Sequence, residues 1–382
     1  MKKVYFDSAA TTQLRPEVIY CMTEALKVEY GNPSSTHAYG RSSKSLIETA
    51  RKEVAAHLNV TAAEIIFTSG GTEADNLALN SCVRDLGVTR IITSRIEHHA
   101  VLYTIQALER QHNIEVAYVA LDDCGHINMD ALKELLEATD DKTLVSLMHV
   151  NNEIGNILDI TAVGTLCKEH GALFHSDTVQ SVGHFKLDLQ ETPIDFLAVA
   201  AHKFHGPKGI GFAFIRKNSG LKPLIFGGEQ ERGLRAGTEP VHNIAGLNEA
   251  LKLSYQNLEK EQAYISDLKE YFKQHISEAI PGVSFNGGCD DTERSTYTLL
   301  NVCLPMTPEK GMMLLFQLDL KGIACSKGSA CQSGATGGSH VLSQILSDED
   351  MAKPSLRFSF SSFNTKEEID YVVSCLKELC EE

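Results

Sequence analysis

Two charged residues stand just after strand-like segments, where their side chains could perform chemistry. Asp177 follows the apolar segment 172–175, and Lys203 follows the apolar segment 196–200, 26 positions further on. In α/β proteins, ligand contacts gather at the ends of buried strands. A carboxylate there can keep a pyridine nitrogen protonated, and a partly desolvated lysine amine can form a Schiff base. Each residue has an ordinary alternative, since Asp177 could cap a helix and Lys203 could be a solvated surface lysine.

A glycine-containing turn, TSGGTE at residues 68–73, lies directly after a predicted strand and directly before a predicted helix. Glycine lets the backbone turn tightly, and the first N–H groups of a helix are available to a phosphate. The motif is short, so a plain strand-to-helix turn remains an alternative.

Cys331 lies in a segment rich in glycine and serine, residues 325–343, which offers few apolar side chains to bury it. A cysteine on an accessible, mobile loop suits a nucleophile that must approach two different partners. The alternative is a small buried hydrophobic residue, the commonest role of a free cysteine. Cys325 could form a disulfide with Cys331, although a buried thiol is the preferred interpretation. We also hypothesise that Lys327 raises the thiolate fraction of Cys331.

These features belong to a longer series of motifs. The series comprises YFDSAATT at 5–12, GNPSS at 31–35, the turn at 70–73, EH at 97–98, HVNNEIG at 149–155, DTVQ at 177–180, HK at 202–203, ERGLRAGT at 231–238, GSAC at 328–331 and LRFS at 356–359. With these motifs the chain resembles, over nearly its full length, the NifS/IscS-type cysteine desulfurases. That family belongs to the class V aminotransferases, in fold-type I of the pyridoxal-phosphate enzymes. The GSAC motif is similar to that of the long-loop subgroup.

The resemblance implies a pyridoxal 5'-phosphate cofactor and a role for each residue around its ring. Lys203 would hold the cofactor and move the substrate Cα proton, and Asp177 would pair with the pyridinium nitrogen. Gln180 would hydrogen-bond the ring hydroxyl. His98 would stack on the ring and act as an acid or base, and Asn152 would contact the side of the ring and the substrate.

The phosphate site is likewise implied by the resemblance. Gly71, Thr72 and His202 would line the phosphate of the cofactor within one subunit. Thr238 would reach the same phosphate from the other subunit, so the resemblance also implies a homodimer.

For the substrate, the resemblance implies L-cysteine with its carboxylate clamped by Arg357, whose planar guanidinium suits that task. The thiolate of Cys331 would attack the substrate sulfur, as in thiol–disulfide exchange, and keep it as a persulfide while L-alanine leaves. The acceptor of this sulfur would be an iron–sulfur scaffold protein, a tRNA-thiolation enzyme or another carrier.

Two alternatives to cysteine desulfuration stay open. A related lyase or transaminase on the same fold, including selenocysteine lyase, would keep its activity after the substitution Cys331→Ala. A protein of another class, a non-catalytic sulfur relay, would lack the absorbance of the cofactor. The joint presence of Lys203, Asp177 and Gln180 argues against the relay.

The chain departs from the family pattern at three positions. Ala200 stands where a serine usually contacts the phosphate, and one neutral hydrogen bond contributes roughly 0.5–1.5 kcal/mol. Glu229 and Ser361 each stand where a glycine is usual. We expect these departures to alter fine geometry and not the type of reaction.

Alternating strand and helix patterns must position these residues. Strands are predicted at residues 65–68, 90–93, 115–119, 144–148, 172–175, 196–200 and 211–215. Helical periodicity marks residues 46–58, 72–84 and 258–279, and a capping box at 365–368 opens a last helix with Ile369, Val372, Val373, Leu376 and Leu379 on one face. The charged run 259–273 is typical of a solvated helix face.

This order of elements predicts an α/β fold with a mainly parallel seven-stranded sheet flanked by helices, plus a smaller α+β domain. We expect a large cofactor-binding domain at residues 14–257. Residues 1–13 and 258–382 would form the small domain, which carries the cysteine loop at about 325–343.

The composition narrows the class of protein. The chain has 382 residues and a formal net charge of −15, which argues against broad nucleic-acid or membrane binding. No apolar run is long enough for a transmembrane helix, and we find no signal peptide. Ten cysteines without framework spacing are typical of a reduced cytoplasmic protein. The histidine and cysteine spacings do not predict a metal site.

Overall fold

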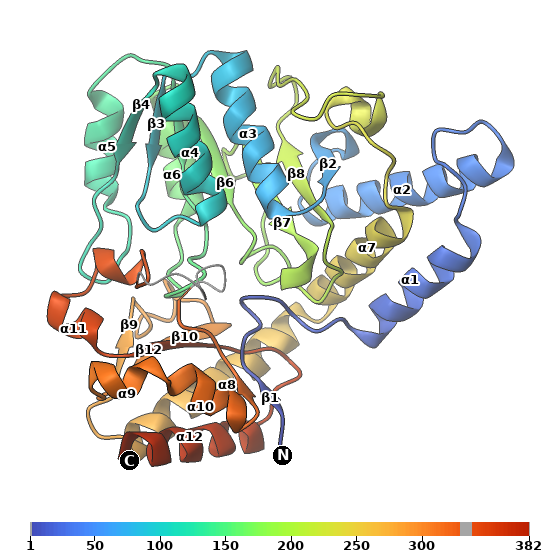
Figure 1. Cartoon of the computed structure of the whole chain (residues 1–382). Helices are drawn as coiled ribbons and strands as arrows, with labels where there is room; N and C mark the ends of the chain where they lie inside the picture. Colours follow the sequence, from blue (N-terminus) through green and yellow to red (C-terminus); the bar gives the residue numbers. More distant parts are fainter. Residues whose placement is uncertain (1, 329–337, 382) are drawn as a thin grey trace.

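The computed structural model describes residues 2–328 and 338–381. A seven-stranded sheet lies at the centre of the larger part of the molecule (Figure 1). Across the sheet the strands follow the order β2 (Ile65–Thr68), β8 (Gly211–Ile215), β7 (Phe196–Ala200), β6 (Leu173–Asp177), β5 (Thr143–Ser146), β3 (Arg90–Thr93) and β4 (Glu115–Tyr118). Strand β8 is antiparallel to both of its neighbours, and the other adjacent strands are parallel. The predicted mainly parallel seven-stranded α/β sheet is confirmed, and β4, β5 and β6 differ from the predicted bounds by one or two residues.

Helices cover both faces of this sheet because its strands are apolar on both sides. On one face lie α3 (Gly71–Leu86) and α4 (His99–His112), which pack against alternate strand residues such as Ile66 and Ala198. On the other face lie α2 (Ala38–His57), α5 (Met129–Glu137), α6 (Ile160–Glu169) and α7 (Val241–Gln256). Helix α1 (Pro16–Val28) packs on α7, and the connection from α1 to α2 projects from the body of the molecule (Figure 1).

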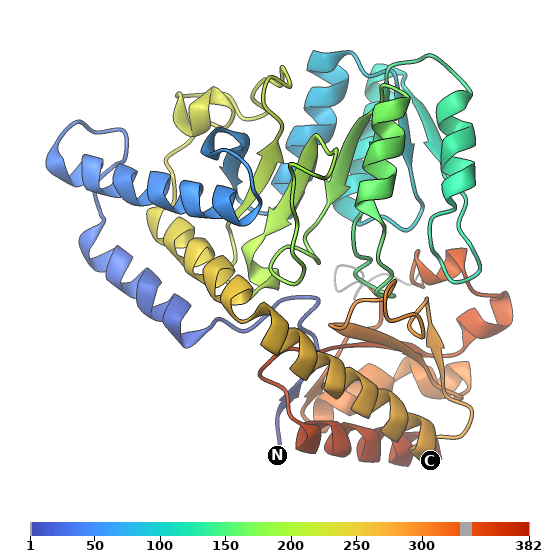
Figure 2. The ribbon, with the colours of Figure 1, turned by 180° about the vertical axis from the view of Figure 1, so that it is seen from behind.

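The C-terminal part builds a second hydrophobic cluster around an antiparallel sheet of order β12 (Ser355–Ser359), β10 (Leu299–Cys303) and β9 (Ser284–Asn286). Helices α8 (Leu258–Ala279) and α12 (Lys366–Glu381) lie side by side against it (Figures 1 and 2). The N-terminal strand β1 (Val4–Tyr5) pairs in parallel with β11 (Ile323–Ala324), and Val4 and Phe6 join this cluster. The domain boundaries at residues 14 and 257 stay a prediction.

Shorter elements complete the described chain. They are α9 (Pro308–Met312), α10 (Leu314–Leu320), α11 (Asp348–Ala352) and the 3-10 turns η1 (Ala62–Glu64), η2 (Ala201–Lys203), η3 (Gln230–Gly233) and η5 (Leu342–Gln344). Within residues 2–328 and 338–381, no helix combines the length and apolar character that a membrane crossing requires.

Local signals in the sequence explain where several helices begin and end. Gly87 ends α3 in the left-handed conformation, with φ 70° and its N–H bonded to Cys82 O. Before α12 the capping box forms as predicted, since Thr365 N donates to Glu368 Oε2 and Glu368 N donates to Thr365 Oγ1. The predicted apolar face of α12 is buried.

The prediction of a fully solvated charged run on α8 is wrong at one residue. Lys269 is 4% exposed, and its Nζ donates to Ser295 Oγ and to Thr296 O. Burial lowers the pKa of Lys269 to about 8. The helix packs closely enough on the C-terminal sheet to enclose this side chain, a tertiary contact that charge patterning does not reveal.

Candidate active site

A cavity of about 220 Å³ opens where β6 and β7 end and α3 begins. Its walls combine strand ends, the N-terminal segment and the C-terminal sheet. It is lined by Ala9, Ala10, Gly71, Thr72, Asp75, His98, Met148, Asn152, Asp177, Val179, Gln180, Ala200, His202, Lys203 and Arg357. Nine of the residues singled out from the sequence for cofactor or substrate binding therefore share one cavity.

Lys203 reaches this cavity from η2, directly after β7. Its Nζ donates hydrogen bonds to Ala9 O at 2.6 Å and to Ala10 O at 2.9 Å. Ala9 lies 194 positions before Lys203 in the chain. A distant N-terminal segment thus holds the amine in place. Gln180 Nε2 donates to the same Ala9 O at 2.9 Å, so the amine and the amide converge on one carbonyl group.

Asp177 is the last residue of β6 and is buried, with 6% of its surface exposed. Its Oδ1 accepts a hydrogen bond from Val179 N at 2.9 Å. Burial is the largest cause of a raised pKa for this carboxyl group, although His98 and Lys203 act in the opposite direction. A cationic N–H in the cavity would therefore stabilise the charged form of Asp177.

A second buried acid, Asp75 on α3, also lines the cavity. Its Oδ1 lies 3.4 Å from His175 Nε2, and the other ring nitrogen of His175 lies 2.9 Å from Ser146 Oγ. Burial raises the pKa of Asp75 and lowers that of His175 to about 3. Both directions favour an uncharged Asp75–His175 pair beside the cavity.

The residues predicted for the phosphate surround the N-terminus of α3. Gly71 begins this helix, and a Cβ atom at Gly71 would lie 2.5 Å from Val179 Cγ2, so only glycine fits there. Thr72 lines the cavity one residue later. The His202 ring lies 3.2 Å from Thr11 Oγ1, and burial beside Lys203 and Lys208 lowers its pKa to about 4. A neutral imidazole and free helix N–H groups can all donate hydrogen bonds to an anion.

His98 precedes α4 and caps it, because its Nδ1 accepts a hydrogen bond from Ala100 N at 3.1 Å. This contact orients the ring along the wall of the cavity. Burial lowers the pKa of His98, so a neutral ring that can stack on a planar ligand is favoured.

Arg357 enters the cavity from β12 and is 1% exposed. Its Nη1 donates to Asn152 O at 2.6 Å, and its Nη2 donates to Asp7 Oδ1 at 3.0 Å. Its Nε has no hydrogen-bond partner within the described part of the chain. The guanidinium is thus held in place, and one buried donor stays available for a ligand carboxylate.

Two predicted site residues remain to be placed. Thr238 is exposed and does not line the cavity of its own chain. Cys331 falls among residues 329–337, outside the described residues, so its contact with Lys327 or Cys325 stays a prediction. Cys325 itself is half-buried, is not bonded to any described cysteine, and has a thiol pKa raised to about 12 by burial.

The three departures from the family pattern occupy different positions. Ala200 lines the cavity, so the absent hydroxyl group would have been close to the ligand. Glu229 directly precedes η3, and Ser361 N donates to Asn364 Oδ1 at 2.9 Å. Only the departure at Ala200 is therefore part of the cavity itself.

The side chains present fit pyridoxal phosphate. Asp177 is a buried carboxylate suited to a protonated ring nitrogen, and Lys203 offers an amine in the same cavity. Gly71 begins α3, and the first N–H groups of a helix are available to a phosphate. Arg357 provides a buried cation for the carboxylate of an amino acid.

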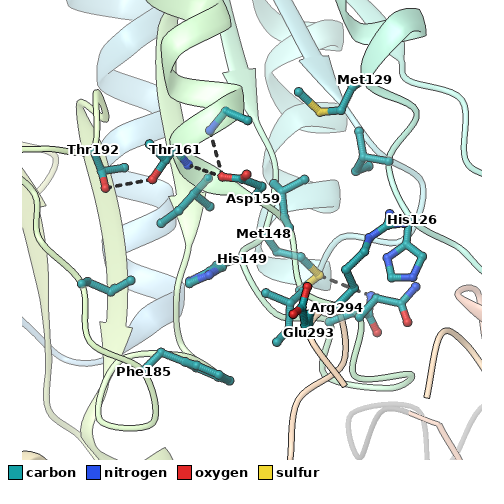
Figure 3. A pocket seen from close by; sticks show the side chains of 18 of the residues that line it. His126, Met129, Met148, His149, Asp159, Thr161, Phe185, Thr192, Glu293 and Arg294 are labelled. Atoms are coloured by element: carbon teal, nitrogen blue, oxygen red, sulfur yellow. Dashed lines mark hydrogen bonds between the residues drawn. The ribbon is translucent and has the colours of Figure 1, made fainter. Parts of the chain in front are cut away.

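A larger cavity of about 930 Å³ lies beside this one and shares the side chain of Met148 with it. Figure 3 shows its wall, with His149 and Phe185 on one side and His126 and Arg294 on the other. Several of its polar groups bond one another, for example Thr161 Oγ1 with Thr192 Oγ1 at 3.3 Å. Size alone therefore does not identify the site of chemistry.

Sequence analysis missed several residues that shape the smaller cavity. Asp7, Ala9 and Ala10 lie within a motif that was recognised, but no role was predicted for them. A signal for Asp75 was available, since it is a charged residue between the apolar positions of α3. Nothing local in the sequence indicates that Met148 separates two cavities.

Comparisons with known proteins agree with this geometry. Residues 4–372 match the family model described as aminotransferase class-V. Over 382 residues the chain is 40% identical to a protein of Dictyoglomus turgidum named cysteine desulfurase IscS, covering 100% of this chain and 95% of that protein.

Solved structures give the same result for the fold. A structure titled NifS-like protein superposes with a TM-score of 0.90 and 33% identity, and covers 100% of both chains. A second structure, titled SspA in complex with cysteine, superposes with a TM-score of 0.82 and 32% identity, covering 95% of this chain and 100% of that one.

Proposed function

Because the chain belongs to the class-V aminotransferase family and is a pyridoxal-phosphate-dependent cysteine desulfurase, we propose which of its residues carry each step of the reaction. One observation supports the assignment above all others. Lys203, Asp177, Gln180, His98 and Arg357 come from separate elements and line a single small cavity.

Binding of the cofactor rests on the two ends of this cavity. Gly71, Thr72 and His202 bind the phosphate, and Asp177 holds a proton on the ring nitrogen. When bound, the cofactor withdraws electrons from the bond that is broken at the substrate Cα. Gln180 would bond the ring hydroxyl, and His98 would stack on the ring, since both line the cavity.

Arg357 and Asn152 orient L-cysteine in the same cavity. Asp7 and Asn152 O accept hydrogen bonds from two nitrogens of Arg357, and its Nε stays available. Arg357 can therefore donate from Nε to the substrate carboxylate. Lys203 Nζ holds the cofactor in the resting enzyme and moves the proton at the substrate Cα. Exclusion of water from this buried site strengthens each of these electrostatic contacts.

Cys331 is the proposed sulfur acceptor within the chain. Its thiolate attacks the sulfur of L-cysteine, the bond between that sulfur and the substrate Cβ breaks, and Cys331 keeps the sulfur as a persulfide. The electron pair of the broken bond stays on the substrate Cβ, which takes up a proton, and the carbon skeleton leaves as L-alanine. The persulfide sulfur then passes to an acceptor protein, for which we propose an iron–sulfur scaffold or a tRNA-thiolation enzyme.

A homodimer completes the phosphate site in this proposal, because Thr238 is exposed in its own chain. Apolar side chains gather on the exposed surface of α1 and α2, among them Tyr20 at 69%, Leu26 at 59% and Tyr39 at 57% exposure. Exposed apolar patches of this kind mark protein interfaces. We also propose a cytoplasmic location, since the nine described cysteines are free thiols.

The test uses the purified holoenzyme with L-cysteine and a reductant. Sulfide and L-alanine are expected in equal amounts, and both are lost in Lys203→Ala and in Cys331→Ala. Release of L-alanine that survives Cys331→Ala would instead favour a lyase that needs no cysteine nucleophile. Mixed dimers of Lys203→Ala and Thr238→Ala chains test whether Thr238 serves the neighbouring subunit.

A further inference from the structure

The side chain of Glu153 is buried beside the active-site cavity, and the reaction as proposed does not use it. It belongs to the turn after β5, one residue after Asn152. The backbone of Glu153 is fixed on both sides, since its N–H donates to Asn151 Oδ1 at 2.9 Å and its carbonyl accepts from Asn301 Nδ2 at 3.0 Å. Its carboxylate therefore has a defined position between the large sheet and the C-terminal sheet.

One oxygen of this carboxylate bonds the residue Ser339, just after the segment 329–337, and lies close to the backbone of Gly328, just before it. Ser339 Oγ donates a short hydrogen bond to Glu153 Oε2. On the other side, Gly328 has φ +77°, and a Cβ atom there would lie 3.2 Å from Glu153 Oε2 and 3.3 Å from Ser339 Cβ. The chain that enters the segment and the chain that leaves it are thus brought together at Glu153.

The second oxygen faces His340. His340 Nε2 lies 2.9 Å from Glu97 O, and because a carbonyl only accepts, Nε2 carries the hydrogen. The other ring nitrogen, Nδ1, lies 3.9 Å from Glu153 Oε1. Neither of these two buried atoms has a hydrogen-bond partner within residues 2–328 and 338–381. His340 thus bonds the residue that directly precedes His98 and faces Glu153 with its other ring nitrogen.

Contacts on the N-terminal side add to the same arrangement. Ser326 pairs with Arg357 through two backbone hydrogen bonds, and Ser326 Oγ donates to Asp7 Oδ1 at 2.8 Å. Asp7 also accepts from Arg357 Nη2. Both ends of the segment therefore contact groups that line or support the substrate side of the cavity.

We propose that Glu153 is a positioning residue that holds the Cys331-bearing segment against the wall of the cavity through its hydrogen bond with Ser339, with Gly328 and His340 packed beside its carboxylate. The inference rests on the proposed function of Cys331. In this role Glu153 does not touch the substrate or the cofactor. It sets the distance from which the thiolate of Cys331 approaches the substrate sulfur, and a misplacement of about 1 Å can reduce a rate by about 100-fold.

The first experiment measures thiol reactivity in protein from which the cofactor has been removed, so it does not depend on turnover. Iodoacetamide labelling followed by peptide mapping gives the alkylation rate of Cys331. Glu153→Ala is expected to change this rate by about two- to tenfold, the equivalent of one lost hydrogen bond. The rate at Cys124, which is exposed, serves as the internal reference and is expected to stay the same.

The second experiment uses the holoenzyme and separates binding from sulfur transfer. Glu153→Ala is expected to lower the rate of persulfide formation on Cys331 roughly 10- to 100-fold, whereas the KM for L-cysteine and the cofactor spectrum stay unchanged. Glu153→Gln keeps a carbonyl acceptor for Ser339 and is expected to restore most of the rate. Glu134→Ala, a substitution at an exposed glutamate, is the matched control.

Several results would overturn the inference. Equal alkylation rates of Cys331 in the wild type and in Glu153→Ala would do so, as would an equal loss of rate in the Gln and Ala variants. If Glu153→Ala does not fold, Ser339→Ala removes the hydroxyl donor alone. An unchanged alkylation rate of Cys331 in that variant would contradict the positioning role of Glu153. Turnover that survives Cys331→Ala would refute the proposed function instead, and the alkylation result would still stand by itself.

Discussion

Two neighbouring cavities share the side chain of Met148 but differ in what their walls offer. The smaller one, of about 220 Å³, brings together a lysine, a buried carboxylate, an amide and a buried arginine. The larger one, of about 930 Å³, also contains charged residues, yet Arg294 is exposed and Lys186 pairs with Glu259 at 3.2 Å. Chemistry at a protein site depends on convergent, desolvated polar groups more than on volume.

The larger cavity provides matched controls for the smaller one because it contains the same residue types. Lys186, Asp159 and Arg294 line the larger cavity and not the smaller one. Each can be changed in the same way as Lys203, Asp177 or Arg357. If substitutions in the larger cavity reduce turnover as much as those in the smaller one, the smaller cavity is not the sole site of chemistry of the two.

The largest effect is expected for the lysine pair. Lys203→Ala removes the amine that holds the cofactor and moves the Cα proton, so release of sulfide and L-alanine should fall by at least about 1,000-fold. Lys186→Ala should leave turnover unchanged. Borohydride reduction and peptide mapping should label Lys203 in the wild type, and a label at another lysine would contradict the assignment.

The aspartate pair should give the next largest effect. Asp177→Asn keeps the shape of the side chain but removes the charge that holds a proton on the ring nitrogen, and the kcat should fall roughly 100-fold. Asp159→Asn keeps an oxygen that can cap α6 through Thr161 N and Ala162 N, so its kcat should match the wild type. Similar losses in both variants would place the effect in folding and not in the cavity.

The arginine pair should separate binding from chemistry. Arg357→Lys loses the planar fork that donates to a carboxylate, and the KM for L-cysteine should rise about tenfold or more. Arg294→Lys should leave the KM unchanged. An Arg357→Lys variant with a normal KM and a reduced kcat would show that Arg357 does not clamp the carboxylate.

Of these two cavities, Glu97 lines only the larger one. Its effect should appear in the pH dependence of the free energy of unfolding. Burial raises its pKa to about 8, whereas the ordinary value is 4.5. Between about pH 4.5 and pH 8 the folded chain therefore binds one more proton than the unfolded chain, and the free energy of unfolding falls as the pH rises, by about 1.4 kcal/mol per pH unit. Glu97→Gln keeps an oxygen that accepts from Ser94 Oγ and Met148 N, and should remove this slope.

Urea unfolding at a series of pH values measures the Glu97 effect. The difference in the free energy of unfolding between wild type and Glu97→Gln should widen from pH 5 to pH 8 in favour of the variant. A constant difference over this range would mean that Glu97 is charged throughout. In that case the larger cavity would hold a buried negative charge.

The smallest effect is expected for Met148, the residue that lines both cavities. Met148→Ala removes apolar contact from the smaller cavity, so the affinity for pyridoxal phosphate should fall roughly fourfold, the equivalent of one buried methylene group. Met129→Ala, which changes the larger cavity and not the smaller one, should leave the affinity unchanged. Equal affinities in both variants would show that the cofactor does not depend on this wall.

Much of the sheet was predictable because each of its strands is a local apolar run between turn signals. β2, β3, β7 and β8 have the predicted bounds. The placement of Lys203 and Asp177 in the smaller cavity was also predictable, since each directly follows such a run. The burial of Lys269 was not, because periodicity on α8 alone does not show which sheet covers the helix.

The sequence by itself determined the fold class, the family and most of the polar residues that line the smaller cavity, because these depend on local patterns and short motifs. Tertiary structure alone decided the contacts between distant segments. It sets Lys203 Nζ on the carbonyls of Ala9 and Ala10, Arg357 on Asp7, and Ser339 on Glu153. Each of these contacts joins residues more than 180 positions apart, and only packing of the two hydrophobic clusters brings such side chains within hydrogen-bonding distance.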